Sequence, residues 1–329
     1  MARLIRRLRH AAGLARLAWQ KRGPLVYALE RAGEPELAPP PPAPAPQPPA
    51  PTALPGHNNV RPYYFFGGNW GLTELSNGLP FFVNTNDRGI APWIVRGGTW
   101  ENFVDDVLCA LARPGHGFVD VGANLGYYTI KIGNLVGPDG RVFSFEPNPE
   151  LFPFLAENIS INGFAQRATA HCLALGAAAG ESTLHFSYSN MGGGHVDVPG
   201  ATAAGGGVAV RIVRLDDVLP PEQHVNLIKI DAEGFEPLIF QGMVGLLARA
   251  PDAAIVTEIS FAAWERFGDP VEILNGVRGT RLVYLIGHDG KLTRVEASDL
   301  RTHISGTFVS YVLLLPDHAE MIDLIGRFL

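Results

Sequence analysis

The sequence predicts an α/β fold in which a mostly parallel sheet carries helices on both faces. Three observations support this fold class. Short apolar runs alternate with segments whose apolar residues recur at helical spacing, which is the order of a doubly wound sheet. The first core run, residues 118–121, leads directly into a glycine-containing turn and a helical segment. Acidic residues stand at or just after the ends of several runs, where open α/β sheets bind their ligands.

The first 34 residues form a basic leader that we separate from the folded domain. Residues 1–22 contain seven Arg and Lys residues and no acidic residue, with apolar residues at roughly helical spacing. A basic amphipathic helix of this kind contacts anionic membrane surfaces or a protein partner, and a disordered leader is the alternative. No stretch has the apolar core of a secretory signal or the length of a membrane span. We therefore expect a cytoplasmic protein, with peripheral membrane attachment as the open alternative.

Residues 35–60 are rich in proline and alanine. Proline removes backbone N–H donors and fixes φ, so this stretch is predicted to be a disordered, extended spacer. The folded domain is then expected over residues 61–329.

A hairpin and a helix are expected before the core sheet, within residues 61–115. Apolar runs flank Asn77-Gly78, a dipeptide that favours the tight turn of a hairpin. Residues 100–111 place apolar side chains at helical intervals. Glu101, at the start of this helix, either reaches an amine of a bound ligand or only favours the helix dipole.

The turn after the first core strand organises the domain. Gly122 allows backbone angles that a side chain forbids, and Gly126 lets a ligand or neighbouring backbone come close. Such a turn leaves free N–H groups at the start of the following helix, residues 127–135, beside the carboxyl end of a strand. We therefore predict that a cofactor is bound here.

Three features favour S-adenosylmethionine over a dinucleotide as this cofactor. The spacing Gly-x-Asn-x-Gly departs from the Gly-x-Gly-x-x-Gly of dinucleotide-binding turns. Asp120, at the strand end, would repel a pyrophosphate but suits a ligand that carries an amine and a sulfonium. Glu146, directly after the second strand at residues 142–145, is placed to accept hydrogen bonds from ribose hydroxyls.

The middle of the domain combines regular elements with a glycine-rich segment. A helix and a third strand are predicted over residues 149–162 and 168–173. The next residues, Ala174-Leu175-Gly176, hold no acid that would bind the adenine amine. Residues 182–188 and 207–213 are expected to pair as strands. The segment that joins them, residues 190–206, is predicted to be a flexible loop that closes over the acceptor, the substrate that binds beside the cofactor.

The fourth strand, residues 226–230, ends in the acidic sequence Asp231-Ala232-Glu233. Alternation places Lys229 and Asp231 on one face of this strand, and a lysine inside a covered strand requires a partner. Because the carboxyl ends of parallel strands lie side by side, Asp120, Asp231 and Glu258 should meet in one crevice. The remaining expected elements are a helix over residues 236–247, a fifth strand over residues 253–257, strands over residues 281–286 and 309–315, and a closing helix over residues 319–328.

Several of these segments together resemble the FkbM family of S-adenosylmethionine-dependent O-methyltransferases. The similar segments are VDVGANLGYYT at 119–129, VFSFEPNPELF at 142–152, IKIDAEGFE at 228–236, and TLHFSYSNMGG followed by RLDDV at 214–218. The resemblance extends from about residue 89 to residue 315. It implies a Rossmann-like class I methyltransferase with a mostly parallel seven-stranded sheet, helices on both faces and an antiparallel edge strand. It also implies methyl transfer to a hydroxyl, commonly on a sugar or a polyketide-derived acceptor.

The site residues follow from these motifs. A hydroxyl acceptor must lose its proton, so we predict Asp231 as the general base, Glu233 as the alternate, and Lys229 as the group that orients the carboxylate or stabilises the alkoxide. His195, in the glycine-rich segment, is a competing base. A second option uses Asp231 and Glu258 as ligands of Mg²⁺. The predicted cofactor-binding residues are Asp120, Gly122, Ala123, Asn124, Gly126, Tyr128, Thr129, Glu146, Pro147, Asn148 and Glu101.

Charge and cysteine content exclude some classes of protein. Seven of the 26 basic residues lie in the first 22 positions, so the remaining chain carries 19 basic residues against 32 acidic ones. This acidic body argues against a nucleic-acid substrate, because contacts with phosphate dominate such binding. The two cysteines, Cys109 and Cys172, form no disulfide framework or zinc motif, which suits a reducing compartment.

Two other functions stay open at this level. An NAD-dependent oxidoreductase on the same sheet would also explain Glu146. A non-catalytic Rossmann-like binding protein, tethered by its N-terminal tail, would explain the leader and the proline-rich spacer. The expected acceptor is a hydroxyl of a glycan or small molecule, and the sequence does not indicate the oligomeric state.

Overall fold

A computed structural model describes residues 61–188, 190–198, 207–304 and 309–329. They belong to a compact unit that spans Asn58–Leu329. The predicted leader, residues 1–34, and the predicted spacer, residues 35–60, lie outside the described residues, and so does much of the predicted flexible loop.

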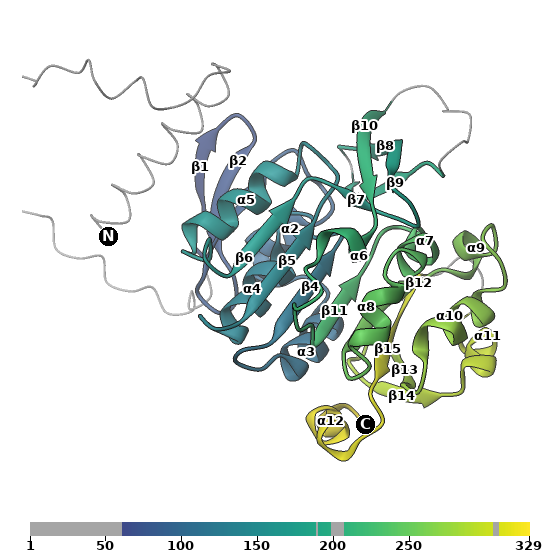
Figure 1. Cartoon of the computed structure of the whole chain (residues 1–329). Helices are drawn as coiled ribbons and strands as arrows, with labels where there is room; N and C mark the ends of the chain where they lie inside the picture. Colours follow the sequence, from purple (N-terminus) through teal and green to yellow (C-terminus); the bar gives the residue numbers. More distant parts are fainter. Residues whose placement is uncertain (1–60, 189, 199–206, 305–308) are drawn as a thin grey trace, which may run out of the picture. The chain divides into compact units, whose positions relative to one another are not determined.

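The core of this unit is an eight-stranded sheet (Figure 1). Five of its strands are parallel and adjacent, as the alternation of strands and helices predicts. The strand order is β14 (Leu292–Val295), β13 (Leu282–Ile286), β15 (Ser310–Leu315), β12 (Ala254–Ile259), β11 (Leu227–Ile230), β4 (Gly117–Val121), β5 (Arg141–Phe145) and β6 (Ala168–His171).

The sheet has an antiparallel edge strand, as predicted, but this strand is not the one formed by residues 309–315. β15 lies between β12 and β13 and is antiparallel to both. The edge is formed by β14, an eighth strand that pairs with β13 as a hairpin. We did not predict β14 because it has only four residues, two of which are exposed, although Asp289-Gly290 before it is a turn dipeptide.

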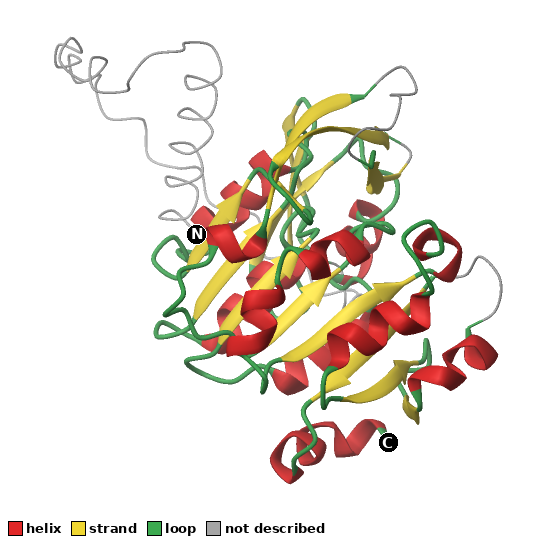
Figure 2. Cartoon of the chain, turned by 45° about the vertical axis from the view of Figure 1, so that its right-hand side comes forward, coloured by secondary structure: helices red, strands yellow, loops and turns green. Residues whose placement is uncertain are grey.

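The central strands are buried along their whole length, which explains their continuous apolar sequences. Every residue of β4, β11 and β12 is buried. Strands covered by helices on both faces lose the alternation of polar and apolar residues and become rich in Val, Ile and Leu. Figure 2 shows helices on both faces of this sheet.

The helices pack against one another as well as against the sheet. α3 packs against α4 and α12, and α4 also packs against α5, while α6 packs against α8. The helices are α2 (Ala91–Gly97), α3 (Asn102–Leu111), α4 (Tyr127–Val136), α5 (Phe152–Ile161), α6 (Leu215–Val218), α7 (Glu236–Gln241), α8 (Val244–Arg249), α9 (Phe261–Trp264), α10 (Pro270–Arg278), α11 (Leu300–His303) and α12 (Ala319–Ile325), with 3-10 turns at Ala297–Asp299 and Gly326–Phe328.

One predicted helix is divided in two. The segment 236–247 was expected to be continuous, but it forms α7 and α8, with a break at Gly242-Met243. Gly242 lies against the backbone of Gly176, and a β-carbon at Gly242 would be 2.0 Å from the carbonyl oxygen of Gly176. This close approach requires glycine at the point where α7 ends.

A second sheet of four strands stands beside the carboxyl ends of the core strands (Figure 1). Its order is β7 (Ala174–Leu175), β10 (Val208–Val213), β8 (Gly180–Ser187) and β9 (Asn190–Val196). The predicted pairing of residues 182–188 with 207–213 corresponds to β8 and β10.

Part of the predicted flexible loop is therefore a strand. β9 occupies the first residues of segment 190–206, although it contains three consecutive glycines. A β-carbon at Gly192 would lie 2.8 Å from Asn124 Nδ2 and 2.9 Å from Ile90 Cδ1, so close packing explains the glycine at this position.

A third sheet of three strands precedes the core. β2 (Trp70–Glu74) and β3 (Pro80–Asn84) form the predicted antiparallel hairpin around Asn77-Gly78. β1 (Tyr64–Gly67), which we did not predict, adds to the other side of β2. Within the residues that the structure describes, no helix combines the length and the apolar character needed to cross a lipid bilayer.

Candidate active site

A cavity of about 610 Å³ opens at the carboxyl ends of β4, β5, β11 and β12. One part of its wall is the glycine turn after β4 together with residues 146–148. The opposite part contains the carboxylates that follow β11 and β12, and aromatic side chains from other elements. Strand β9 of the second sheet covers part of the cavity through Met191 and its glycines.

The glycine turn has the backbone that the sequence predicts. Gly122 has φ of 71°, and a β-carbon there would lie 1.8 Å from the carbonyl oxygen of Asp231. Gly126 has φ of 92° and precedes α4, and its β-carbon would lie 2.7 Å from Leu155 Cδ1. Glycine is thus required at both positions, by conformation and by space.

Three non-glycine residues in the described parts of the chain have a positive φ. They are Glu101, Asn124 and Glu233, with φ of 41°, 53° and 54°. All three line the same cavity. Residues held in such conformations cost about 1–3 kcal/mol each and cluster at functional sites, so this coincidence marks the cavity as functional.

Glu146 is buried and accepts hydrogen bonds from two backbone segments, the glycine turn and the residues that follow β5. Its Oε2 accepts a hydrogen bond from Asn124 N at 2.7 Å, and its Oε1 accepts one from Asn148 N at 2.8 Å. Burial raises the pKa of Glu146 to about 7. Each carboxylate oxygen keeps a second lone pair, so the side chain retains the ability to accept hydrogen bonds from a ligand.

Asn148 provides an unused donor at this end of the cavity. The residue is 2% exposed and lines the cavity, and its Nδ2 has no hydrogen-bond partner among the described residues. Buried polar groups are nearly always hydrogen-bonded, so this amide indicates a ligand with an acceptor atom nearby.

Asp120 and Thr129 are not part of the cavity wall, although we predicted both as cofactor-binding residues. Both side chains are fully buried, and Thr129 Oγ1 donates to Asp120 Oδ2 at 2.6 Å. Burial raises the pKa of Asp120, while the positive charge of Lys229 opposes this effect. The structure therefore gives Asp120 a position behind the turn. The other predicted cofactor-binding residues, except Gly126, line the cavity.

Asp231 and Lys229 form an ion pair at the end of β11. Lys229 Nζ lies 3.0 Å from Asp231 Oδ2, and it also donates to the carbonyl oxygen of Gly122 at 3.3 Å. Lys229 is 2% exposed. Burial alone would lower its pKa, but the neighbouring carboxylates of Asp231 and Asp120 raise it, so the lysine is a cation. The predicted pairing of this strand lysine is thus present.

Tyr311 connects Asp231 to Glu101. Its hydroxyl lies 2.9 Å from Asp231 Oδ2 and 3.1 Å from Glu101 Oε1. Tyr128 donates to the other oxygen of Glu101 at 3.0 Å. Burial and the negative charge of Asp231 raise the pKa of Glu101 to about 7. Glu101 therefore points into the cavity and makes no capping hydrogen bond to the helix that it precedes.

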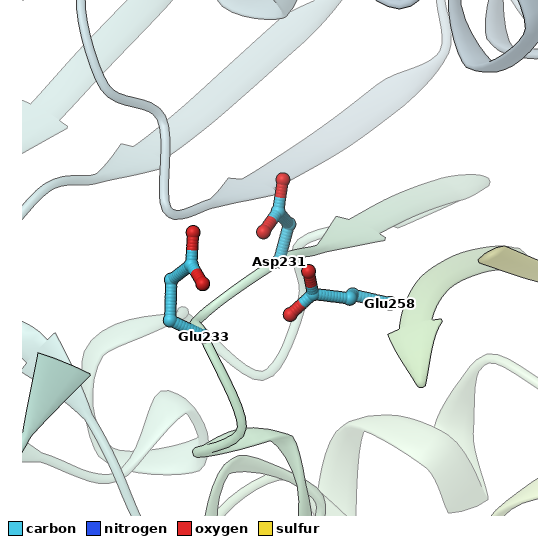
Figure 3. Close-up of side chains that lie close together, drawn as sticks. All are labelled: Asp231, Glu233 and Glu258. Atoms are coloured by element: carbon cyan, nitrogen blue, oxygen red, sulfur yellow. The ribbon is translucent and has the colours of Figure 1, made fainter. Parts of the chain in front are cut away.

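Glu233 and Glu258 complete an acidic cluster with Asp231. Figure 3 shows the three carboxylates close together. One carboxylate oxygen from each residue lies within 4.8 Å of the others. Burial and the charge of Asp231 raise the pKa of Glu233 to about 7, and the same causes raise the pKa of Glu258 well above its ordinary value.

The histidine that lines the cavity is not the one that we predicted as a base. His195 lies on β9 but does not line the cavity; its ring stacks on His185 with 5.3 Å between ring centroids. His288, by contrast, lines the cavity and packs edge-on against Phe103.

Several cavity residues had no signal in the sequence. Tyr311 is one of them, because a single tyrosine in a predicted strand is not distinguishable from a core residue. It stands opposite Glu258 in the register of β12 with β15, and this pairing was not predicted. Trp100, Phe103 and Met191 were likewise not predicted as wall residues.

Comparison with known proteins identifies the family. The model of the methyltransferase FkbM domain matches residues 120–325, which include the glycine turn, Glu146 and the Asp231 segment. The chain belongs to the FkbM methyltransferase domain family. Its class is therefore that of a methyltransferase dependent on S-adenosylmethionine, as the sequence predicts, and the NAD-dependent alternative is not supported.

Two curated relatives match a short part of this FkbM-family chain. The protein-L-isoaspartate O-methyltransferases of Methanopyrus kandleri and Aeropyrum pernix are 44% and 40% identical to it over 52 residues. That stretch is 16% of this chain and covers 23% and 20% of the two relatives, respectively.

Solved structures of methyltransferases are also similar. A precorrin-6y C5,15-methyltransferase from Geobacter metallireducens has 16% identity and a TM-score of 0.36, over 65% of this chain and 87% of that chain. A SAM-dependent methyltransferase from Aquifex aeolicus has 16% identity and a TM-score of 0.34, over 65% of this chain and 89% of that chain.

Proposed function

We propose that this protein transfers the methyl group of S-adenosylmethionine to a hydroxyl of a glycan or related natural-product acceptor. The observation that carries the proposal is the single cavity that joins the glycine turn to Asp231. A donor site and a base that share one cavity are what methyl transfer to a hydroxyl requires. Both curated relatives are named O-methyltransferases, which agrees with an oxygen acceptor.

The residues around the glycine turn fit S-adenosylmethionine. Asn148 offers an unpaired amide donor, and Glu146 offers acceptor capacity for ribose hydroxyls. The wall near residues 173–175 is apolar apart from its backbone, which suits the adenine ring. We infer that Glu146, Asn148 and the turn from Gly122 to Gly126 hold this ligand. When bound, it supplies a methyl carbon to the acceptor oxygen and leaves as a neutral thioether, with the electron pair of the broken bond on sulfur.

Asp231 is the proposed general base. Lys229 Nζ and the Tyr311 hydroxyl both contact its Oδ2, whereas no hydrogen bond to its Oδ1 is present among the described residues. The side chain is 20% exposed to the cavity. The acceptor hydroxyl proton therefore passes to Oδ1, while Lys229 holds the carboxylate in place and favours its ionised form.

Glu233 is the alternate base, and its position on the same side of the cavity supports this role. It lies beside Asp231 and has a pKa of about 7, which is closer to neutrality than that of an ordinary glutamate. A base that is half-ionised near neutral pH combines proton affinity with availability.

The carboxyl groups on the side of the cavity opposite the glycine turn favour an uncharged polyhydroxyl acceptor. They belong to Glu101, Asp231, Glu233 and Glu258, and Lys229 adds one ammonium. Carboxyl groups form hydrogen bonds with hydroxyl groups in either protonation state. Trp100 and Phe103 add aromatic surface of the kind that packs on sugar rings.

A labelling experiment tests the proposal. Full-length protein is incubated with S-adenosylmethionine carrying a tritiated methyl group and with fractionated cell extract, and the label is followed into glycans and small molecules by mass spectrometry. We expect the label in a methyl ether, formed on a hydroxyl oxygen and stable to base. Label recovered only on nitrogen, carbon or protein carboxyl groups would contradict it.

A further inference from the structure

Tyr311 lies between two carboxyl groups but has only one hydrogen to share. Its hydroxyl oxygen is 3.1 Å from Glu101 Oε1 and 2.9 Å from Asp231 Oδ2, and the residue is 6% exposed. A phenol donates a single hydrogen bond. If both carboxyl groups were ionised, one of these two short contacts would place two acceptor oxygens together without a hydrogen. One carboxyl group must therefore carry a proton.

Asp231 is not the group that carries it. The ammonium of Lys229 lies 3.0 Å from Asp231 Oδ2, and an adjacent positive charge stabilises the ionised carboxylate. Glu101 has no ion pair among the described residues. Burial and the charge of Asp231 both favour the neutral form of Glu101 and raise its pKa to about 7.

We propose that Glu101 is a positioning residue that acts through Tyr311. As a neutral acid it donates from Oε1 to the Tyr311 oxygen, and the Tyr311 hydrogen is then committed to Asp231 Oδ2. This role rests on the proposed function of Asp231 as the base. It explains why Oδ2 receives two donors, Lys229 and Tyr311, while Oδ1 is left to take the acceptor proton.

The backbone of Glu101 supports a dedicated role. Glu101 has φ of 41° and is the residue before α3, yet it makes no capping hydrogen bond to that helix. A left-handed conformation costs a non-glycine residue about 1–2 kcal/mol. An acidic side chain in this position would ordinarily interact with the free N–H groups of the helix. Here the side chain instead reaches Tyr128 and Tyr311.

The tyrosines and the lysine that face Glu101 do not titrate in the same range. The pKa values of Tyr128 and Tyr311 lie well above that of a free tyrosine because both are buried, so both keep their hydrogens. Lys229 remains a cation. The glutamates are the exceptions: the pKa of Glu233 is also about 7, and burial with the charge of Asp231 raises that of Glu258 well above its ordinary value. Glu146, on the other side of the cavity, has a pKa of about 7 as well. The experiment must therefore distinguish Glu101 from these three residues.

The test is a titration of glutamate carboxyl groups in the full chain, without methyl donor or acceptor. Protein labelled with ¹³C at the glutamate side-chain carboxyl is followed by NMR in the wild type, Glu101→Gln and Tyr311→Phe. We expect one resonance with a midpoint near pH 7 to be absent from Glu101→Gln. In Tyr311→Phe this resonance should titrate at a lower pH, because the neutral acid has lost the acceptor of its proton.

The direction of the shift in Tyr311→Phe decides the proposal. If Tyr311 donated to an ionised Glu101, its removal would raise the midpoint, and the proposal would be wrong. It would be equally wrong if Glu101→Gln lost no resonance that titrates near pH 7. Glu233→Gln, Glu258→Gln and Glu146→Gln assign the resonances of the other glutamates with a raised pKa. Tyr284→Phe, a change at a buried tyrosine in β13 that is 3% exposed, is the matched control and should shift neither midpoint.

Two features keep the test decisive. If Glu101→Gln does not fold, as judged by thermal unfolding, the shift in Tyr311→Phe still supports or contradicts the proposal. Because neither methyl donor nor acceptor is present, the result does not depend on methyl transfer. If no methyl transfer is found but the Glu101 resonance titrates as expected, the proposed function is rejected and the proton on Glu101 is kept. If methyl transfer is found but the resonance does not titrate as expected, the proposed function is kept and the proton assignment is rejected.

Discussion

Gly122 is in contact with the backbone of Asp231. A β-carbon at Gly122 would lie 1.8 Å from the carbonyl oxygen of Asp231, and Asp231 N donates to Val121 O at 3.2 Å. The turn that we assign to the methyl donor and the residue that we assign as base are thus packed together without an intervening side chain. Their relative position is set by two adjacent parallel strands, β4 and β11.

Gly122→Ala should impair donor binding and turnover together. The added methyl group must displace the Asp231 carbonyl or the turn itself, so we expect at least a ten-fold loss of affinity for S-adenosylhomocysteine by calorimetry. Gly163→Ala is the matched control, because Gly163 has nearly the same φ, 72°, and nothing within 4 Å of its β-carbon. It should lower stability by about 1–2 kcal/mol and leave binding intact. Equal binding losses in both variants would point to strain alone.

Asp231→Asn should separate binding from catalysis. Asparagine keeps the size of the side chain but cannot accept the hydroxyl proton, and general base catalysis contributes about 100-fold or more. We expect that loss in turnover, with S-adenosylhomocysteine affinity within a few-fold of the wild type. Glu265→Gln, at a side chain that is 59% exposed, is the control. Wild-type turnover in Asp231→Asn would move the role of base to Glu233.

The pKa of Glu146 makes the stability of the protein depend on pH. Its folded-state pKa of about 7 lies above the ordinary value of 4.5, so the folded protein binds more protons than the unfolded chain between these values. The free energy of unfolding should therefore fall as pH rises from about 4.5 to about 7, by up to about 3 kcal/mol from this residue. Urea denaturation at pH 5 and pH 8 measures the change. Glu146→Gln should reduce the difference between the two; an unchanged difference would exclude Glu146 as its source.

Removal of divalent metal ions should leave turnover unchanged. The ammonium of Lys229, 3.0 Å from Asp231 Oδ2, supplies the positive charge next to this carboxylate and would repel a dication. We therefore expect dialysis against a chelator to have no effect on the methyl-transfer rate. A loss of activity that Mg²⁺ restores would favour the alternative, in which Asp231 and Glu258 bind the metal.

The sequence predicts the parts of the site that belong to local patterns. The turn from Gly122 to Gly126 and the acids after β5 and β11 could be located because a strand, a turn and a helix follow one another within few residues. Lys229 could be flagged because a charged residue inside a buried strand requires a partner. These signals depend only on neighbours along the chain.

The remaining features depend on contacts between distant segments. Tyr311 reaches Asp231 because β15 enters the sheet between β12 and β13, and nothing near residue 311 indicates that order. The glycines of β9 suggest a loop until their packing against Ile90 and Asn124 is known. Asp120 has the sequence position of a ligand-binding acid, but its side chain is held behind the turn by Thr129, whose hydroxyl also pairs with that of Ser144 on β5.

The pairing of β7 with β10 has a consequence for access to the cavity. Ala174 and Leu175 line the cavity and are also hydrogen-bonded in parallel to Ile212 and Val213 of the small sheet. The small sheet cannot swing outward without pulling this wall with it. If the methyl donor binds along this wall as proposed, then an outward movement of the small sheet that admits a bulky acceptor would also loosen the donor pocket.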